Sequence, residues 1–290
     1  MNHRCAAFAA LAAVLIATAA PAQQGATPRP AAPAVQVGQK SNFFTASDGI
    51  KIHYLTHGDR GSWVMLIHGY SDSAQRMWFN TGIAPEIAKR HRVVAIDNRN
   101  HGQSDKPIPG GSGRAQDVIE LMDHLKIDRA HIHGYSMGGG IVGQLLALIP
   151  NRFITAGFGG SGMSETNDTY RAAAEAMDDA LPKATGADAE GMERFRARVA
   201  AARPQGSPAA ATRAPAAPAV DLTKLEIPIL AVNGSYDNPY RKTHRLWREV
   251  RIFQNVILPG KTHLTAIAAG AAPSQQYVDA IAKFIDMYDK

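Results

Sequence analysis

The sequence predicts an α/β domain, with a mostly parallel sheet flanked by helices. From residue 42 onward, short apolar runs rich in β-formers alternate with helical stretches, and strands separated by such helices pair in parallel. Of the 290 residues, 45% are hydrophobic and 19% are charged, which allows an ordinary globular core and excludes a wholly disordered or fibrous chain. One large domain is therefore expected over residues 41–290.

The expected strands are apolar runs bounded by turn signals. Asp48-Gly49 predicts a hairpin turn, so two antiparallel strands should open the sheet. The later runs are continuously apolar, as is typical of strands buried on both faces. The expected strands are 43–47, 51–56, 63–67, 92–96, 130–133, 153–158, 229–232 and 256–258.

The expected helices show apolar residues at helical spacing. One helical face carries Val118, Leu121, Met122 and Leu125. Pro150 ends a different expected helix, 136–148. The expected helices are 83–90, 115–125, 136–148, 169–181, 190–202, 242–251 and 274–288.

The first 22 residues predict a secretory signal peptide. Arg4 supplies a positive start, an apolar run follows, and Ala20-Pro21-Ala22 offers small residues for cleavage. The run is about 16 residues long, shorter than the ~20 that span a bilayer, which favours cleavage over a retained anchor. We therefore expect a periplasmic or secreted bacterial protein that begins at Gln23 and has no stable membrane insertion.

Charge and cysteine content exclude several classes of function. The net charge of +6 is moderate and spread along the chain, which argues against a nucleic-acid partner. Cys5 is the only cysteine and lies in the expected signal peptide, so the mature protein has no disulfide and no cysteine nucleophile. Two Pro- and Ala-rich stretches, 23–40 and 203–219, are expected to be a disordered tether and a flexible loop.

A nucleophile motif stands between a predicted strand and a predicted helix. Gly134-Tyr135-Ser136-Met137-Gly138 has the pattern of a nucleophile elbow, in which a serine occupies a strained turn between small residues. A serine hydroxyl needs a base that is oriented by a third group. His263 follows the last strand and suits the base, and Asp237 follows the preceding strand and suits the acid.

Four motifs in this order resemble the α/β-hydrolase superfamily, in its serine esterase-like form. They are His68-Gly69, the segment 97–104, the elbow around Ser136, and the late Asp237 and His263. The resemblance covers residues 43–290, except for a poorly matching stretch at about 163–220. It implies an α/β-hydrolase fold with a small helical lid insertion at about 160–220.

The resemblance also implies roles for further residues. The backbone N–H groups of Tyr70 and Met137 would form the oxyanion hole, which stabilises charge on the substrate oxygen. Some relatives place the acid after an earlier strand, so Asp168 and Glu165 remain alternatives to Asp237. Asn100 stands where the superfamily usually has a glycine in a turn. Asparagine can take that place because it also adopts left-handed conformations.

Several basic and histidine residues have two interpretations each. The lid arginines and the basic residues near position 245 could meet an acidic substrate, although a solvated helix face is the simpler interpretation. They are Arg194, Arg196, Arg198 and Arg203, and Arg241, Lys242, Arg245, Arg248 and Arg251. His131 and His133 could form a metal pair, but packed and hydrogen-bonded core histidines are favoured.

The expected function is hydrolysis of carboxylic, thio- or lactone esters through an acyl-enzyme on Ser136, without a cofactor or metal. The serine excludes enzymes of this superfamily that use an aspartate or cysteine at the elbow. No arginine can be placed near Ser136 from the sequence, so the expected partner is a small to medium, neutral ester. The alternatives are a cofactor-free perhydrolase, a carbon–carbon bond hydrolase with the same triad, and a non-catalytic binding protein. The oligomeric state cannot be read from the sequence.

Overall fold

The computed structural model describes residues 38–107, 113–201, 220–267 and 275–289. The predicted signal peptide 1–22, nearly all of the predicted tether and the predicted loop 203–219 lie outside these residues. The described residues form one eight-stranded sheet in the order β1-β2-β4-β3-β5-β6-β7-β8. β2 runs antiparallel to β1 and β4, and all other neighbours are parallel.

The strands confirm the expected series, including the antiparallel opening pair. Their bounds are β1 Lys40–Thr45, β2 Lys51–His57, β3 Trp63–Ile67, β4 Arg92–Ile96, β5 Ala130–Tyr135, β6 Phe153–Gly159, β7 Ile229–Gly234 and β8 Phe253–Leu258. Two starts were predicted too late. β1 begins with Lys40, inside the predicted tether, and β8 carries exposed Gln254 and Asn255 near its start. Both are outer strands of the sheet, where polar residues interrupt the apolar pattern.

The helices also follow the predicted series. Their bounds are α1 Ile83–Ala88, α2 Arg114–His124, α3 Met137–Leu148, α4 Asp168–Asp179, α5 Gly186–Ala201, α6 Pro239–Glu249 and α7 Gln275–Tyr288. One five-residue π-helical turn, η1 at Gln75–Phe79, was not predicted. No helix among the described residues is both long and apolar enough to span a bilayer.

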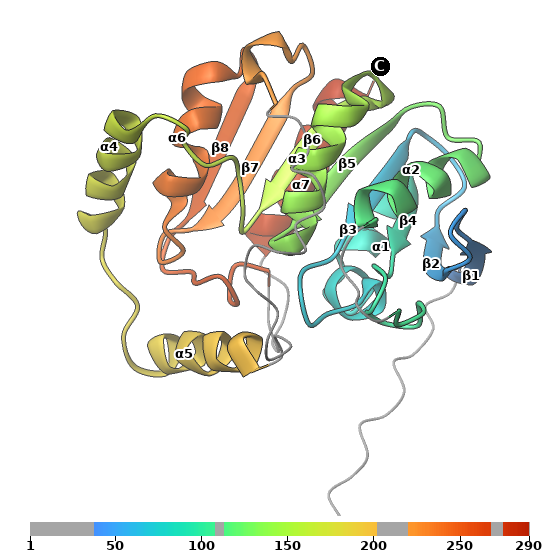
Figure 1. Ribbon diagram of the computed structural model, residues 1–290, viewed down its shortest axis with the longest axis horizontal. Helices are drawn as coiled ribbons and strands as arrows, with labels where there is room; N and C mark the ends of the chain where they lie inside the picture. The colour runs from blue at the N-terminus through green and yellow to red at the C-terminus, as the bar shows by residue number, and fades with distance from the viewer. Residues whose placement is uncertain (1–37, 108–112, 202–219, 268–274, 290) are drawn as a thin grey trace, which may run out of the picture. The chain divides into compact units, whose positions relative to one another are not determined.

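Helices cover both faces of the sheet, as predicted. Buried side chains of α2, α3 and α6 pack on one face, and α2 and α3 lie in front of the strands in Figure 1. Buried side chains of η1, α1 and α7 pack on the other face. The strands are therefore buried between two apolar layers, which explains their continuous apolar sequences.

The motifs of the sequence lie just beyond the carboxyl ends of parallel strands. His68 follows β3, Asp97 follows β4 and Ser136 follows β5, while Asp237 and His263 lie in the loops after β7 and β8. Ligands in open parallel sheets bind at this edge. The fold thus brings residues from five strand ends to one place.

Candidate active site

Ser136 occupies a strained turn between β5 and α3. Its φ of 54° and ψ of −110° lie outside the regions that most residues adopt. A Cβ at Gly134 would lie 2.2 Å from the Gly138 carbonyl oxygen, and a Cβ at Gly138 would lie 2.1 Å from the Ile67 carbonyl oxygen. Only glycine fits at these two positions, so the elbow glycines allow the close backbone approach that presents the serine.

The structure brings Ser136, His263 and Asp237 together. His263 Nε2 lies 2.9 Å from Ser136 Oγ, and His263 Nδ1 lies 2.8 Å from Asp237 Oδ2. A carboxylate only accepts, so it selects the tautomer with the proton on Nδ1 and leaves the Nε2 lone pair toward the serine hydroxyl. This arrangement can remove a proton from Ser136 Oγ.

The two alternative acids lie elsewhere. The Asp168 side chain is 94% exposed and pairs with Arg171 in its own helix. Glu165 is buried and accepts from His244 Nδ1 at 2.5 Å and from an Arg248 nitrogen at 2.8 Å. Neither carboxylate has a contact with the His263 ring among the described hydrogen bonds and ion pairs.

Tyr135 holds the histidine loop, a role that the sequence did not reveal. Its hydroxyl donates to the His263 carbonyl oxygen at 2.5 Å. Burial raises the pKa of Tyr135 well above its ordinary value, so the hydroxyl remains a donor. The residue before Ser136 therefore ties the His263 backbone to the elbow.

Lys242 is a second residue whose role was missed. Its Nζ lies 2.6 Å from Asp237 Oδ2, the same oxygen that faces His263. Burial lowers the pKa of Lys242, and Asp237 opposes that shift. The ammonium compensates part of the carboxylate charge and thereby limits how strongly Asp237 attracts the His263 proton.

Several basic residues near Lys242 form ion pairs within the protein, and Arg241 and Arg248 are also exposed, in agreement with a solvated helix face. Arg248 donates to Glu165, and Arg245 donates to Glu249 at 3.0 Å. These ion pairs lie within α6 or between α6 and the segment before α4. Arg245 and Glu249 have the i, i+4 spacing of a helix. Glu165, the partner of Arg248, comes from a separate element, so no spacing in the sequence marks it.

The predicted oxyanion donors come from the start of α3 and from the segment after β3. Met137 is the first residue of α3, so its N–H has no acceptor within the helix. Tyr70 follows the end of β3 and lines the same cavity as Ser136. Its neighbour His68 is fixed by a 2.7 Å contact from Nδ1 to the Gly69 oxygen. Burial lowers the pKa of His68 to about 4, so the ring is neutral near pH 7.

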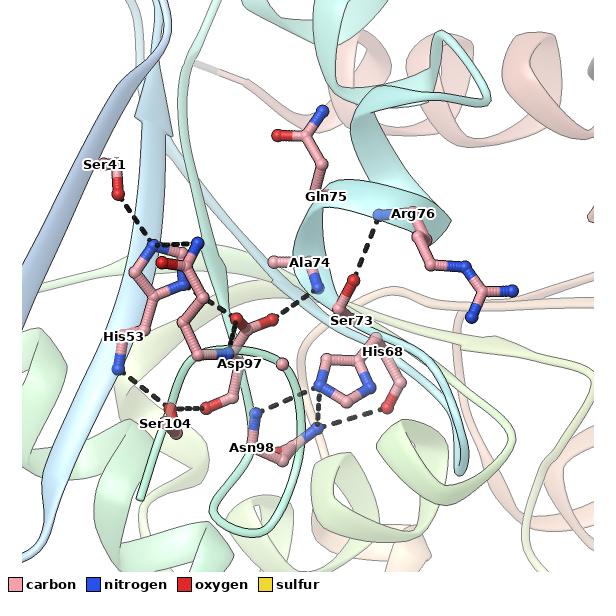
Figure 2. Close-up of polar contacts among 12 residues, drawn as sticks. Ser41, His53, His68, Ser73, Ala74, Gln75, Arg76, Asp97, Asn98 and Ser104 are labelled. Carbon is pink, nitrogen blue, oxygen red and sulfur yellow. Dashed lines mark hydrogen bonds and ion pairs between the residues drawn. The ribbon is translucent and has the colours of Figure 1, made fainter. Parts of the chain in front are cut away.

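Asp97 anchors the segment that runs from Tyr70 into η1. Figure 2 shows its carboxylate between His53 and the start of η1. It accepts from Ala74 N at 2.7 Å, from His53 Nδ1 at 2.7 Å and from Gln103 N at 2.8 Å. Burial raises the pKa of Asp97, but these hydrogen bonds outweigh it and the pKa is lowered overall. The ionised Asp97 thus holds the start of η1, which supplies part of the cavity wall.

A cavity of about 580 Å³ opens over Ser136. Its walls come from the segment after β3, from η1, from α5 and from the loop that carries His263. The lining residues are Gly69, Tyr70, Ser71, Asp72, Arg76, Met77, Asn80, Thr81, Tyr135, Ser136, Phe195, Arg198, His263, Leu264 and Ile267.

The cavity contains two arginines that the sequence could not place. Arg76 comes from η1 and Arg198 from α5, which lies within the predicted lid. The expectation of a neutral substrate depended on there being no assignable arginine near Ser136, and that premise does not hold. The two arginines reach the cavity because η1 and α5, which are far apart in the sequence, both supply its wall.

His131 and His133 are packed core residues, as favoured from the sequence. His133 Nε2 lies 2.8 Å from Tyr277 Oη, and His131 Nδ1 lies 2.9 Å from Thr155 Oγ1. Burial lowers the pKa of His133 to about 3 and that of His131 to about 4. The described part of the chain shows no cluster of three or more side chains arranged to hold a metal ion.

Turn geometry at Asn100 also agrees with the sequence. Its φ of 69° is left-handed, which asparagine tolerates. A Cβ at the neighbouring Gly102 would lie 2.0 Å from Asp97 Oδ2. Gly102, not position 100, is where the approach to Asp97 requires glycine.

Comparison with known proteins places the chain in a family. A profile of the α/β-hydrolase fold matches residues 62–207, about half of the chain. The acetyltransferase component of the acetoin cleaving system from Cupriavidus necator is 34% identical over 114 residues, 39% of this chain and 30% of that protein. The esterase YbfF from Escherichia coli is 35% identical over 91 residues, 31% of this chain and 34% of that protein. The aligned segments thus span about a third of each relative's length.

A solved structure supports the same fold over a longer stretch. The thermophilic esterase from Thermogutta terrifontis superposes with a TM-score of 0.63 at 22% identity, covering 87% of this chain and all of that one. Similarity at this level establishes the architecture. Together with the profile match across the elbow, it shows that this chain belongs to the α/β-hydrolase family.

Proposed function

We propose that this protein is a serine hydrolase that cleaves carboxylic esters, with thioesters and lactones as the next candidates. The observation that carries the proposal is the hydrogen-bonded series from Ser136 through His263 to Asp237, at 2.9 and 2.8 Å. It opens into a cavity whose walls include the predicted oxyanion donor Tyr70. An esterase among the curated relatives and another among the similar structures agree with this chemistry.

The proposed reaction has two halves. His263 Nε2 takes the hydroxyl proton while Ser136 Oγ attacks the ester carbonyl, and the N–H groups of Tyr70 and Met137 stabilise the oxyanion. The intermediate collapses, the C–O bond to the alcohol breaks, and His263 returns the proton to the departing oxygen. Water then attacks the acyl-enzyme with His263 as base, which releases the acid and restores Ser136.

Labelling of the nucleophile tests this proposal directly. A fluorophosphonate should react with the native protein, and peptide mapping should find the label on Ser136. Ester turnover separates an esterase from a carbon–carbon bond hydrolase, and the ratio of acyl transfer to water and to hydrogen peroxide separates it from a perhydrolase with the same residues. Absence of both labelling and turnover would instead favour the non-catalytic binding protein.

Acyl-chain preference is expected to be shallow, with an optimum at short to medium chains. Met77, Phe195, Leu264 and Ile267 supply apolar surface to the cavity, but the charged side chains of Asp72, Arg76 and Arg198 also line it and interrupt a long apolar groove. A long apolar groove would add about 0.8 kcal/mol per buried methylene and give a steep rise in kcat/KM. Initial rates on p-nitrophenyl esters from acetate to palmitate measure this. A steep rise beyond about twelve carbons would contradict the prediction and indicate a lipase.

We also propose that the protein is exported to the periplasm or secreted, because residues 1–22 have the sequence pattern of a signal peptide. The mature chain is expected to begin at or near Gln23. Intact-mass measurement of protein from a periplasmic or culture-medium fraction checks this. Recovery of a chain that still begins with Met1 would contradict export.

A further inference from the structure

We propose that the preferred substrates are esters that carry a second, negatively charged carboxylate, with Arg198 of α5 as the group that attracts it. This deepens the ester hydrolysis proposed above and rests on it. The class is that of monoesters of dicarboxylic acids, or esters whose alcohol part carries a carboxylate.

Three charged side chains of the described residues line the cavity, and they are Asp72, Arg76 and Arg198. Arg76 already has a carboxylate partner on the cavity wall, with its Nε 3.7 Å from Asp72 Oδ1. Burial raises the pKa of Asp72, while Arg76 and Arg198 oppose that shift. Arg198 is near enough to Asp72 to affect its pKa, yet within the described residues Arg198 forms no ion pair with a carboxylate, so its guanidinium can still pair with a substrate carboxylate.

The Phe195 ring lies near both His263 and Arg198. The Phe195 ring centroid lies 5.8 Å from that of His263, and the Arg198 guanidinium carbon lies 5.7 Å from the Phe195 centroid. Arg198 is thus one aromatic ring away from the proposed base. A carboxylate several bonds from the scissile carbonyl could reach the guanidinium while the carbonyl lies over Ser136.

Position on α5 separates Arg198 from its neighbours. Arg194 is on the same helix and pairs with Glu190 at 3.4 Å, and it does not line the cavity. Arg196 does not line it either. The run of lid arginines therefore contains one described member with access to the reaction site, and Arg194 provides a matched control of equal charge.

The test compares esters of equal length with and without the charge. The first pair is the p-nitrophenyl monoester of adipic acid and p-nitrophenyl hexanoate; the second is 4-carboxyphenyl butyrate and phenyl butyrate. For each pair, the ratio of kcat/KM for the anionic ester to that for the neutral ester is measured in the native protein, Arg198→Gln, Arg198→Lys and Arg194→Gln. Comparing ratios between proteins cancels the intrinsic reactivity of the esters.

At low ionic strength we expect Arg198→Gln to lower this ratio about three- to tenfold in at least one pair, a size typical of a solvated charge. Arg198→Lys should retain most of the native ratio, and Arg194→Gln should retain it fully. About 0.5 M salt should reduce the native ratio, since it screens exposed charges.

Two results would overturn the inference, and they are distinguishable. If Arg198→Gln and Arg194→Gln both keep the native ratio in both pairs while esters are turned over, the charge preference is wrong and the ester hydrolase proposal stands. If no ester is turned over and fluorophosphonate does not label Ser136, both proposals fail.

Discussion

Ser136→Ala is expected to lower kcat for ester hydrolysis about a million-fold and to leave roughly 10³-fold acceleration over water, as in another serine hydrolase whose triad acts as a unit. The variant removes the atom that attacks the carbonyl, while the oxyanion donors and the cavity remain. His263→Ala should have a similar effect, because the hydroxyl then lacks its base. Single-turnover and steady-state rates on a p-nitrophenyl ester measure both.

Ser161→Ala is the matched control for this experiment. Ser161 lies just beyond β6, and its hydroxyl donates to the Gly159 carbonyl oxygen at 3.0 Å. Its loss should leave ester turnover within a few-fold of the native rate. Near-native activity in Ser136→Ala or His263→Ala would reject the proposed mechanism.

Asp237→Asn is expected to lower kcat about 10⁴-fold. The amide of asparagine can donate to His263 Nδ1, which would stabilise the tautomer whose Nε2 proton faces Ser136. The imidazolium also loses its counter-charge, and the Lys242 ammonium, 2.6 Å from Asp237 Oδ2 in the native protein, would then oppose it. The pH profile of kcat/KM, measured beside the rate at neutral pH, reports both effects.

The alternative acids provide controls for Asp237. Asp168→Asn changes an exposed carboxylate and should leave kcat nearly unchanged. Glu165→Gln removes a buried charge that pairs with His244 and Arg248, so it should lower the melting temperature with a much smaller effect on kcat. If Asp168→Asn were instead the damaging change, the acid would belong to the segment after β6.

Local backbone and apolar patterns account for the parts of this protein that the sequence predicts well. β3 and β4 match their predicted bounds at both ends, because each is a continuous apolar run that is buried on two faces. The elbow is equally local, since the glycines at 134 and 138 are required by contacts around one turn. The helical turn η1 was missed because its five residues are too few for a helical period to show.

The sequence by itself determined the α/β class, the order of the strands and helices along the chain, and the position of the elbow that carries Ser136, because these follow from short-range periodicity and turn sterics. Only the tertiary structure showed that His263 and Lys242 both contact Asp237 Oδ2. It also showed that, of the described arginines at 194, 196 and 198, Arg198 alone lines the cavity. A charge on a helix has the same local sequence whether it faces water, a carboxylate or a substrate. Its partner is decided by how distant elements dock, and in this fold that docking occurs at the carboxyl edge of the sheet.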